Sequence, residues 1–324
     1  MNTGMKITAF AVTLAATFGA AYGVGNGVDP VSTEADAAAH GQHGDGADGG
    51  KAKGGGKEGG HGPPGGLQVS EDGYTLALET ERLEAGKKEE LRFEVLDEAG
   101  KPVTEYKREH GKDLHLIVAS RGLTEYRHLH PSLAEGGTWS TDVELPEAGD
   151  YRVFTDFIPG DEAEGLTLGA DLAVGGDYDP PTLPEESKTA TVGDYEVTLD
   201  GDLTTGQGTD MRFTVEKNGK PVTDLDPYLG AYGHLVALRA GDMGYLHVHP
   251  NGTPGDGETK PGPGISFMAT APTAGDYRLF LDFKHEGEVR NVSFTVPVAA
   301  SDDGSGKEQA PSGGEEEKSG GHQH

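Results

Sequence analysis

The clearest indication of the fold is the segment Ala274-Gly-Asp-Tyr-Arg-Leu-Phe-Leu-Asp-Phe283. From Tyr277 to Phe283 an apolar residue occupies every second position, which places these side chains on one face of a β-strand. The Ala-Gly-Asp-Tyr that precedes the strand is typical of a tyrosine corner, in which the tyrosine hydroxyl bonds back to the preceding turn. This combination predicts a strand of an immunoglobulin-like β-sandwich.

The same stretch occurs earlier in the chain, at residues 148–157, as part of an internal repeat. Matching residues that precede the tyrosine corner lie 119 positions apart in the two repeats, whereas those of the corner and its strand lie 126 positions apart. The second repeat therefore has seven extra residues, which we place in the Gly- and Pro-rich segment 253–264. The upstream matches are Gly100–Thr104 with Gly219–Thr223, His115 with His234, Tyr126 with Tyr245, and His128-Leu-His-Pro131 with His247-Val-His-Pro250.

Other segments of each repeat also have a period of two, for example Leu91, Phe93 and Val95. No helical period follows residue 30. We predict an all-β fold of two tandem immunoglobulin-like β-sandwiches, repeat 1 at 67–176 and repeat 2 at 188–300, joined by a linker at 177–187.

Two segments near the ends of the chain, 29–66 and 301–324, contain few apolar side chains that could be buried in a core. Residues 41–66 contain 13 glycines in 26 positions, so we expect 29–66 to be a disordered His- and Gly-rich linker and 301–324 a disordered acidic tail. Residues 7–28 have no charged side chain, so 1–28 reads as a signal peptide or a membrane anchor. Both alternatives place the rest of the chain outside the cytoplasm.

The charge balance excludes several functions. The 324 residues have a formal net charge of -29, of which -23 falls on 67–300. This excess of carboxylates argues against binding nucleic acid or an anionic membrane face, which require Lys and Arg. The chain has no Cys, and therefore no disulfide, thiolate metal site or cysteine nucleophile.

Three histidines of each repeat have the spacing of a metal site. His128 and His130 lie two residues apart and so share one face of a strand. A hairpin centred on Arg121-Gly122 would place His115 directly opposite His128. Repeat 2 predicts the same trio, His234, His247 and His249, around Ala240-Gly241.

Three imidazoles without a thiolate suit Zn²⁺ or Cu²⁺ with an open position. Asp156, Asp282, Tyr126 and Tyr245 are candidates for a supporting shell that orients the imidazoles, although an Asp can equally bond nearby backbone. The other interpretation of the six histidines is a hydrogen-bonded structural network or a protonation switch. We assign His110 and His285 no role, because their counterparts in the other repeat are Leu229 and Pro159.

These motifs resemble exported bacterial modules of immunoglobulin-like build, similar to the YtkA-like and CopC-like domains associated with copper and heavy-metal handling. The resemblance covers about 90–157 and 209–283 and rests on Gly-Lys-Pro-Val-Thr, the His…His-x-His-Pro pattern and Gly-Asp-Tyr-Arg. It implies an immunoglobulin-like fold and a metal role for the six paired histidines.

The sequence thus predicts an extracytoplasmic protein that binds Cu²⁺ or Zn²⁺ for sequestration or transfer, with one three-His site per repeat. The alternative is a metal-free structural module or one that binds another extracytoplasmic protein. The weakest hypothesis is an enzyme. No general base or nucleophile is duplicated near the histidines apart from the tyrosines and aspartates named above, so we predict no catalytic residue.

Overall fold

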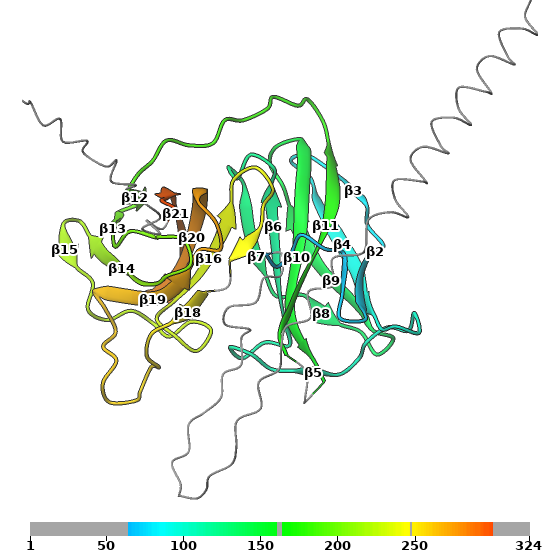
Figure 1. The fold of residues 1–324 in the computed structure, drawn as a ribbon, viewed down its shortest axis with the longest axis horizontal. Coiled ribbons are helices and arrows are strands. Elements are labelled where there is room, and N and C mark those ends of the chain that lie inside the picture. The colour runs from blue at the N-terminus through cyan, green and yellow to red at the C-terminus, as the bar shows by residue number, and fades with distance from the viewer. Residues whose placement is uncertain (1–63, 161–163, 247, 301–324) are drawn as a thin grey trace, which may run out of the picture. The chain divides into compact units, whose positions relative to one another are not determined.

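The computed structural model describes residues 64–160, 164–246 and 248–300, and Figure 1 shows each repeat as two β-sheets. The N-terminal segment 1–28, nearly all of the linker 29–66 and the tail 301–324 lie outside the described residues. Within the described residues every regular element is a strand, as the period of two predicts, and no helix there is long and apolar enough to cross a membrane.

Repeat 1 folds into two sheets that face each other. One sheet contains, in spatial order, β1 (Ser70–Glu71), β2 (Tyr74–Leu78), β4 (Lys88–Leu96), β9 (Thr138–Glu144) and β8 (Ser132–Leu133). The other contains β3 (Arg82–Glu84), β11 (Leu166–Gly175), β10 (Gly149–Pro159), β6 (Leu114–Ser120) and β7 (Tyr126–Leu129), with β5 (Tyr106–Lys107) paired to β10. The apolar positions of both sheets, such as Phe93 and Val153, are fully buried between them.

Repeat 2 has the same two-layer plan. One sheet contains β12 (Thr189–Val192), β13 (Tyr195–Asp200), β14 (Gly208–Lys217), β19 (Gly264–Thr270) and β18 (Val248–Pro250), with β15 (Lys220–Pro221) paired to β14. The other contains β17 (Tyr245–Leu246), β16 (Gly233–Arg239), β20 (Gly275–His285) and β21 (Glu288–Val298). Two tandem immunoglobulin-like sandwiches are therefore confirmed.

Both tyrosine corners have the expected hydrogen bond. The hydroxyl of Tyr151 donates to the carbonyl oxygen of Glu147 at 2.9 Å, and that of Tyr277 donates to Thr273 at 3.1 Å. Both tyrosines are almost fully buried, so each hydroxyl needs this partner.

We expect Tyr277→Phe to lower the free energy of unfolding by about 1 kcal/mol, since it deletes one buried hydrogen bond and leaves the Thr273 carbonyl without that donor. Urea denaturation measures the change. Tyr178→Phe is the matched control, because Tyr178 is exposed and should leave stability unchanged. Equal effects of the two substitutions would contradict the role of the corner.

A third apolar core joins the two repeats. In β6 all seven residues are buried, because Leu114, Leu116 and Val118 face the core of repeat 1 while Ile117 and Ala119 face repeat 2. We call this set the inter-repeat core: Ile117, Ala119, Leu123, Tyr126, Phe154, Val236, Leu238, Met243, Tyr245 and Phe280. The sequence predicts two separate sandwiches joined by a linker, and this contact is not among its predictions.

The inter-repeat core is nearly symmetric. Tyr126 of repeat 1 stacks on Phe280 of repeat 2, with ring centroids 4.2 Å apart. The counterparts, Tyr245 of repeat 2 and Phe154 of repeat 1, lie 5.8 Å apart. Each repeat thus contributes the same two aromatic positions, and the contact resembles the two-fold interface of a homodimer.

Candidate metal centre

Four histidines meet at the edge of the inter-repeat core, three from repeat 1 and one from repeat 2. We call them the histidine cluster: His115, His128, His130 and His234. One nitrogen from each of His115, His128 and His234 can be chosen so that all three lie within 4.8 Å of one another. This is the one such group of three potential ligands found in the described part of the chain.

The hairpin register that we predict for repeat 1 is wrong by two residues. Ile117, not His115, pairs with His128, because the loop closes with the amide of Ser120 bonded to the carbonyl of Glu125. A shift of two residues keeps every side chain on its face, so His115, His128 and His130 still converge.

Repeat 2 does not assemble its own trio in the predicted way. Its hairpin pairs Ala237 with Leu246, the same two-residue shift, and β18 then joins the opposite sheet through β19. His249 is exposed there and pairs with Met268, so it does not face His234. His234 lies instead against His128, with ring centroids 4.4 Å apart. His247 lies outside the described residues.

The outer nitrogens of two cluster histidines are held by hydrogen bonds. Nδ1 of His128 lies 2.9 Å from Oδ2 of Asp282, which belongs to repeat 2, and both side chains are at most 5% exposed. Nε2 of His115 lies 3.3 Å from the carbonyl oxygen of Glu109. A backbone carbonyl and a carboxylate oxygen accept hydrogen bonds, so these two contacts favour the tautomers in which Nδ1 of His128 and Nε2 of His115 carry the hydrogen.

This assignment leaves two lone pairs facing each other. Nδ1 of His115 and Nε2 of His128 are 3.1 Å apart, and in these tautomers neither nitrogen carries a hydrogen. Two facing acceptors at this distance repel each other. A metal ion between them, a proton on one ring or the other tautomer of His115 would relieve the repulsion. Two imidazole nitrogens bound to one tetrahedral Zn²⁺ lie about 3.3 Å apart, since each Zn–N bond is about 2 Å.

Burial keeps most of the cluster neutral. Desolvation and the neighbouring His128 lower the pKa of His115 to about 4, and the same two causes lower the pKa of His130 to about 3. Desolvation lowers the pKa of His234 well below its ordinary value. Neutral imidazole is the form that binds metal.

Two ring nitrogens of the cluster lack a hydrogen-bond partner within the described residues. They are Nε2 of His130 and Nδ1 of His234, both buried. A buried polar atom without a partner is costly, and a bound ion or water is one way to satisfy it.

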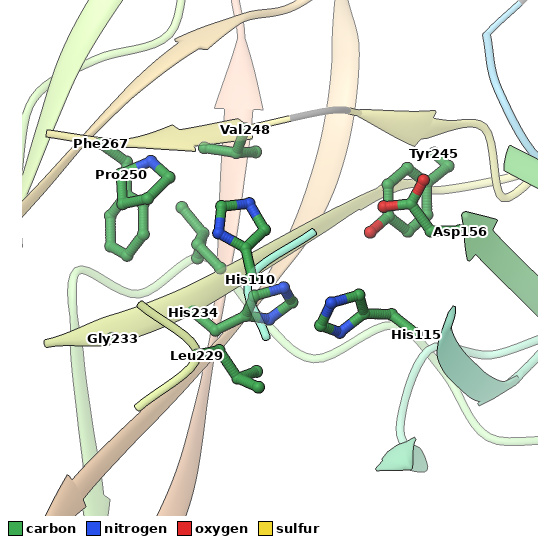
Figure 2. A pocket seen from close by; sticks show the side chains of 11 residues that line it. His110, His115, Asp156, Leu229, Gly233, His234, Tyr245, Val248, Pro250 and Phe267 are labelled. Atoms are coloured by element: carbon green, nitrogen blue, oxygen red, sulfur yellow. The ribbon is translucent and has the colours of Figure 1, made fainter. Parts of the chain in front are cut away.

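A small cavity adjoins the cluster (Figure 2). Its volume is about 20 Å³, room for roughly one water molecule. Figure 2 shows the rings of His110, His115 and His234 close to one another and Asp156 beside Tyr245. His110, for which the repeat pattern predicts no role, thus reaches the cluster, and its ring centroid is 6.2 Å from that of His115. A comparison of the repeats misses His110 because the matching residue, Leu229, is apolar.

The candidates for the supporting shell have different surroundings. Asp282 accepts from Asn291 as well as from His128, whereas Asp156 accepts from Thr167 at 3.0 Å and lines the cavity. Tyr126 and Tyr245 pack in the inter-repeat core. His285, also without an assigned role, bonds Tyr195 and Asp224 within repeat 2.

The fold and the paired repeats define a tandem immunoglobulin-like protein with a histidine cluster between its modules. The chain belongs to a family described as a domain of unknown function, DUF8832, whose model matches residues 68–171 and 190–300. No curated protein has a significant sequence match to the chain.

Solved structures with which the chain aligns include an adhesin, fibronectin(III)-like modules and a putative membrane-anchored protein. The Escherichia coli adhesin FdeC is 16% identical over 71% of this chain, with a TM-score of 0.23, and the chain spans 65% of its length. Fibronectin(III)-like modules of Clostridium thermocellum CbhA are 9% identical over 70% of this chain and 95% of theirs, with a TM-score of 0.20. A putative membrane-anchored protein of Corynebacterium diphtheriae is 11% identical over 71% of this chain and 59% of its own, with a TM-score of 0.22.

Proposed function

We propose that the chain is an extracytoplasmic protein that binds one Zn²⁺ or Cu²⁺ ion between its two repeats, for sequestration or transfer. The observation that carries the proposal is the pair of facing nitrogens, His115 Nδ1 and His128 Nε2, with His234 beside them. The ligands are His115 and His128 of repeat 1 and His234 of repeat 2. We propose no catalytic role.

The surroundings support an ion at this position. Asp282 accepts the outer N–H of His128, an arrangement that orients metal-binding imidazoles and makes them more basic. Three imidazoles without a thiolate favour Zn²⁺ and Cu²⁺ over softer Cu(I). The adjoining cavity would hold a water molecule or an exchangeable ligand, and His130 lies beside the three ligands. The charge of -23 on 67–300 would raise the local concentration of any cation.

The export that the sequence predicts supports the choice of metal and location. The uncharged segment 7–28 is typical of a secretion signal or an anchor, and a chain without Cys has no thiol to be oxidised outside the cytoplasm. The YtkA-like and CopC-like resemblance points to the same class of function.

Calorimetric titration of the full chain with ZnCl₂, and separately with CuCl₂, tests the proposal. We expect one equivalent to bind tightly and further ions to bind weakly to the histidines of the two chain ends. His128→Gln and His234→Gln should each weaken the tight equivalent at least tenfold, because each removes a ligand from a different repeat. His249→Gln is the matched control and should leave the tight equivalent unchanged, since His249 is exposed and lies outside the cluster.

The second candidate is a metal-free module that is structural or binds another protein. The inter-repeat core favours it, because these apolar contacts can hold the repeats together without an ion. In that case His128→Gln and His234→Gln would titrate like the unaltered chain, a result that would overturn the metal proposal.

A further inference from the structure

The seven extra residues of repeat 2 build a pocket that is separate from the histidine cluster. The segment between β18 and β19 forms one wall of a cavity of about 510 Å³, and β14 forms another. This volume is in the usual range for small-molecule sites. The polar lining residues are Arg212, Tyr232, Asn251, Glu258, Thr259, Lys260 and Ser266.

Arg212 differs from its counterpart in repeat 1. Arg92, on the equivalent strand β4, donates from Nε to Glu79 at 2.8 Å and also lies near Glu90. Arg212 has no ion pair and no side-chain hydrogen bond to any residue that the structure describes. Its exposed guanidinium therefore presents its donors to the pocket without a carboxylate paired to it, and Glu258 lines the same pocket without forming an ion pair with it.

Gly264 allows the guanidinium to take this position. A Cβ atom at Gly264 would lie 2.5 Å from Nη2 of Arg212, closer than real Cβ contacts come. Any other residue at position 264 would displace the guanidinium. The absence of a side chain at Gly264 is therefore what lets the unpaired Arg212 guanidinium occupy its position.

The loop wall is held in place by one side chain. The carboxylate of Asp256 accepts hydrogen bonds from the backbone N–H groups of Thr253, Glu258 and Thr259 and from the hydroxyl of Thr259, at 2.6–3.1 Å. These bonds hold the pKa of Asp256 well below its usual range. The wall is thus formed before any ligand arrives, which lowers the entropic cost of binding.

We propose that this pocket binds a sugar acid, with the ligand carboxylate on Arg212 and its hydroxyl groups on the remaining polar side chains. Arg212 and Lys260 provide positive charge for one carboxylate, and Glu258 disfavours a second. Asn251 and Ser266 can bond hydroxyls, and the ring of Tyr232 offers a flat surface for a sugar ring. The proposal does not depend on the metal site.

Titration of the ¹⁵N-labelled full chain with D-glucuronate, followed by NMR, tests this proposal. We expect shifts of the Gly264 and Tyr232 amides and of the Arg212 side-chain N–H, with a Kd on the order of 1 mM for a ligand of this size. D-glucose and acetate are the probes that lack, respectively, the carboxylate and the sugar body, and each should bind at least fivefold more weakly.

Arg212→Gln should weaken glucuronate binding at least tenfold, and Gly264→Ala should weaken it by displacing the same guanidinium. Arg92→Gln is the matched control and should have no effect. An unchanged thermal midpoint for Arg212→Gln shows that the fold is intact. The absence of shifts at 20 mM glucuronate, or equal binding of acetate, would overturn the proposal.

Discussion

Zn²⁺ should raise the thermal midpoint of the metal-free full chain by about 5–10 °C when its free concentration is a hundred times Kd. Binding to the folded state alone at that ratio adds about 2.7 kcal/mol to the free energy of unfolding. A protein of this size gains about 2–4 °C per kcal/mol. Because the proposed ligands come from both repeats, a bound ion should join the two sandwiches into one unfolding unit. Differential scanning calorimetry would show the shift and a sharper transition.

Variants of the cluster separate this effect from loose binding at the chain ends. His128→Gln should abolish most of the shift, and His249→Gln should retain it. Asp282→Asn should weaken the metal affinity by roughly ten- to a hundredfold, because the neutral amide makes His128 less basic. Asp171→Asn is its control, since Asp171 is exposed and pairs with Arg152. An equal shift in all four variants would contradict a site at the cluster.

Val236→Asp should separate the two repeats and cost several kcal/mol of stability. Val236 is fully buried in the inter-repeat core, so the substitution places an unpaired carboxylate in an apolar contact. Val236 faces repeat 1 rather than the core of its own sandwich, and each sandwich should therefore remain folded. The radius of gyration from small-angle X-ray scattering should increase, and the tight metal equivalent should be lost with His234.

Val289→Asp is the matched control, because Val289 lies in the same repeat and is 47% exposed. It should change neither the scattering nor the metal titration. If Val236→Asp kept the compact scattering profile and full metal affinity, the inter-repeat core would not be what brings His234 to the other histidines.

Much of the fold could be predicted because its signals are local. The period of two at Tyr277 to Phe283 marks a strand, and the Gly-Asp-Tyr before it marks the corner that the hydrogen bond to Thr273 confirms. The internal repeat predicts that the second module has the same plan. The spacing of His115, His128 and His130 predicts that they share a face, and a two-residue error in register does not alter that.

The contact between the repeats was harder to predict, although its signal is present. The runs Leu114–Ser120 and Gly233–Arg239 do not alternate, which is typical of strands buried on both faces. Neither run by itself predicts what covers its second face. The hydrophobic effect is non-directional, so an apolar face does not specify which other apolar surface packs against it. The position of His249 could not be predicted either, because β18 pairs with β19 of the opposite sheet instead of continuing the hairpin with β16.

Side-chain alternation and hairpin spacing are short-range properties, and they were enough to predict the strands, the two sandwiches and the three histidines that repeat 1 brings to one face. The folded chain was needed to show that His234 joins those histidines, that Asp282 of one repeat bonds His128 of the other, and that the two repeats share one cluster. The physical reason is that these contacts cross more than a hundred residues of chain and arise from the burial of Ile117, Val236 and their neighbours between the repeats.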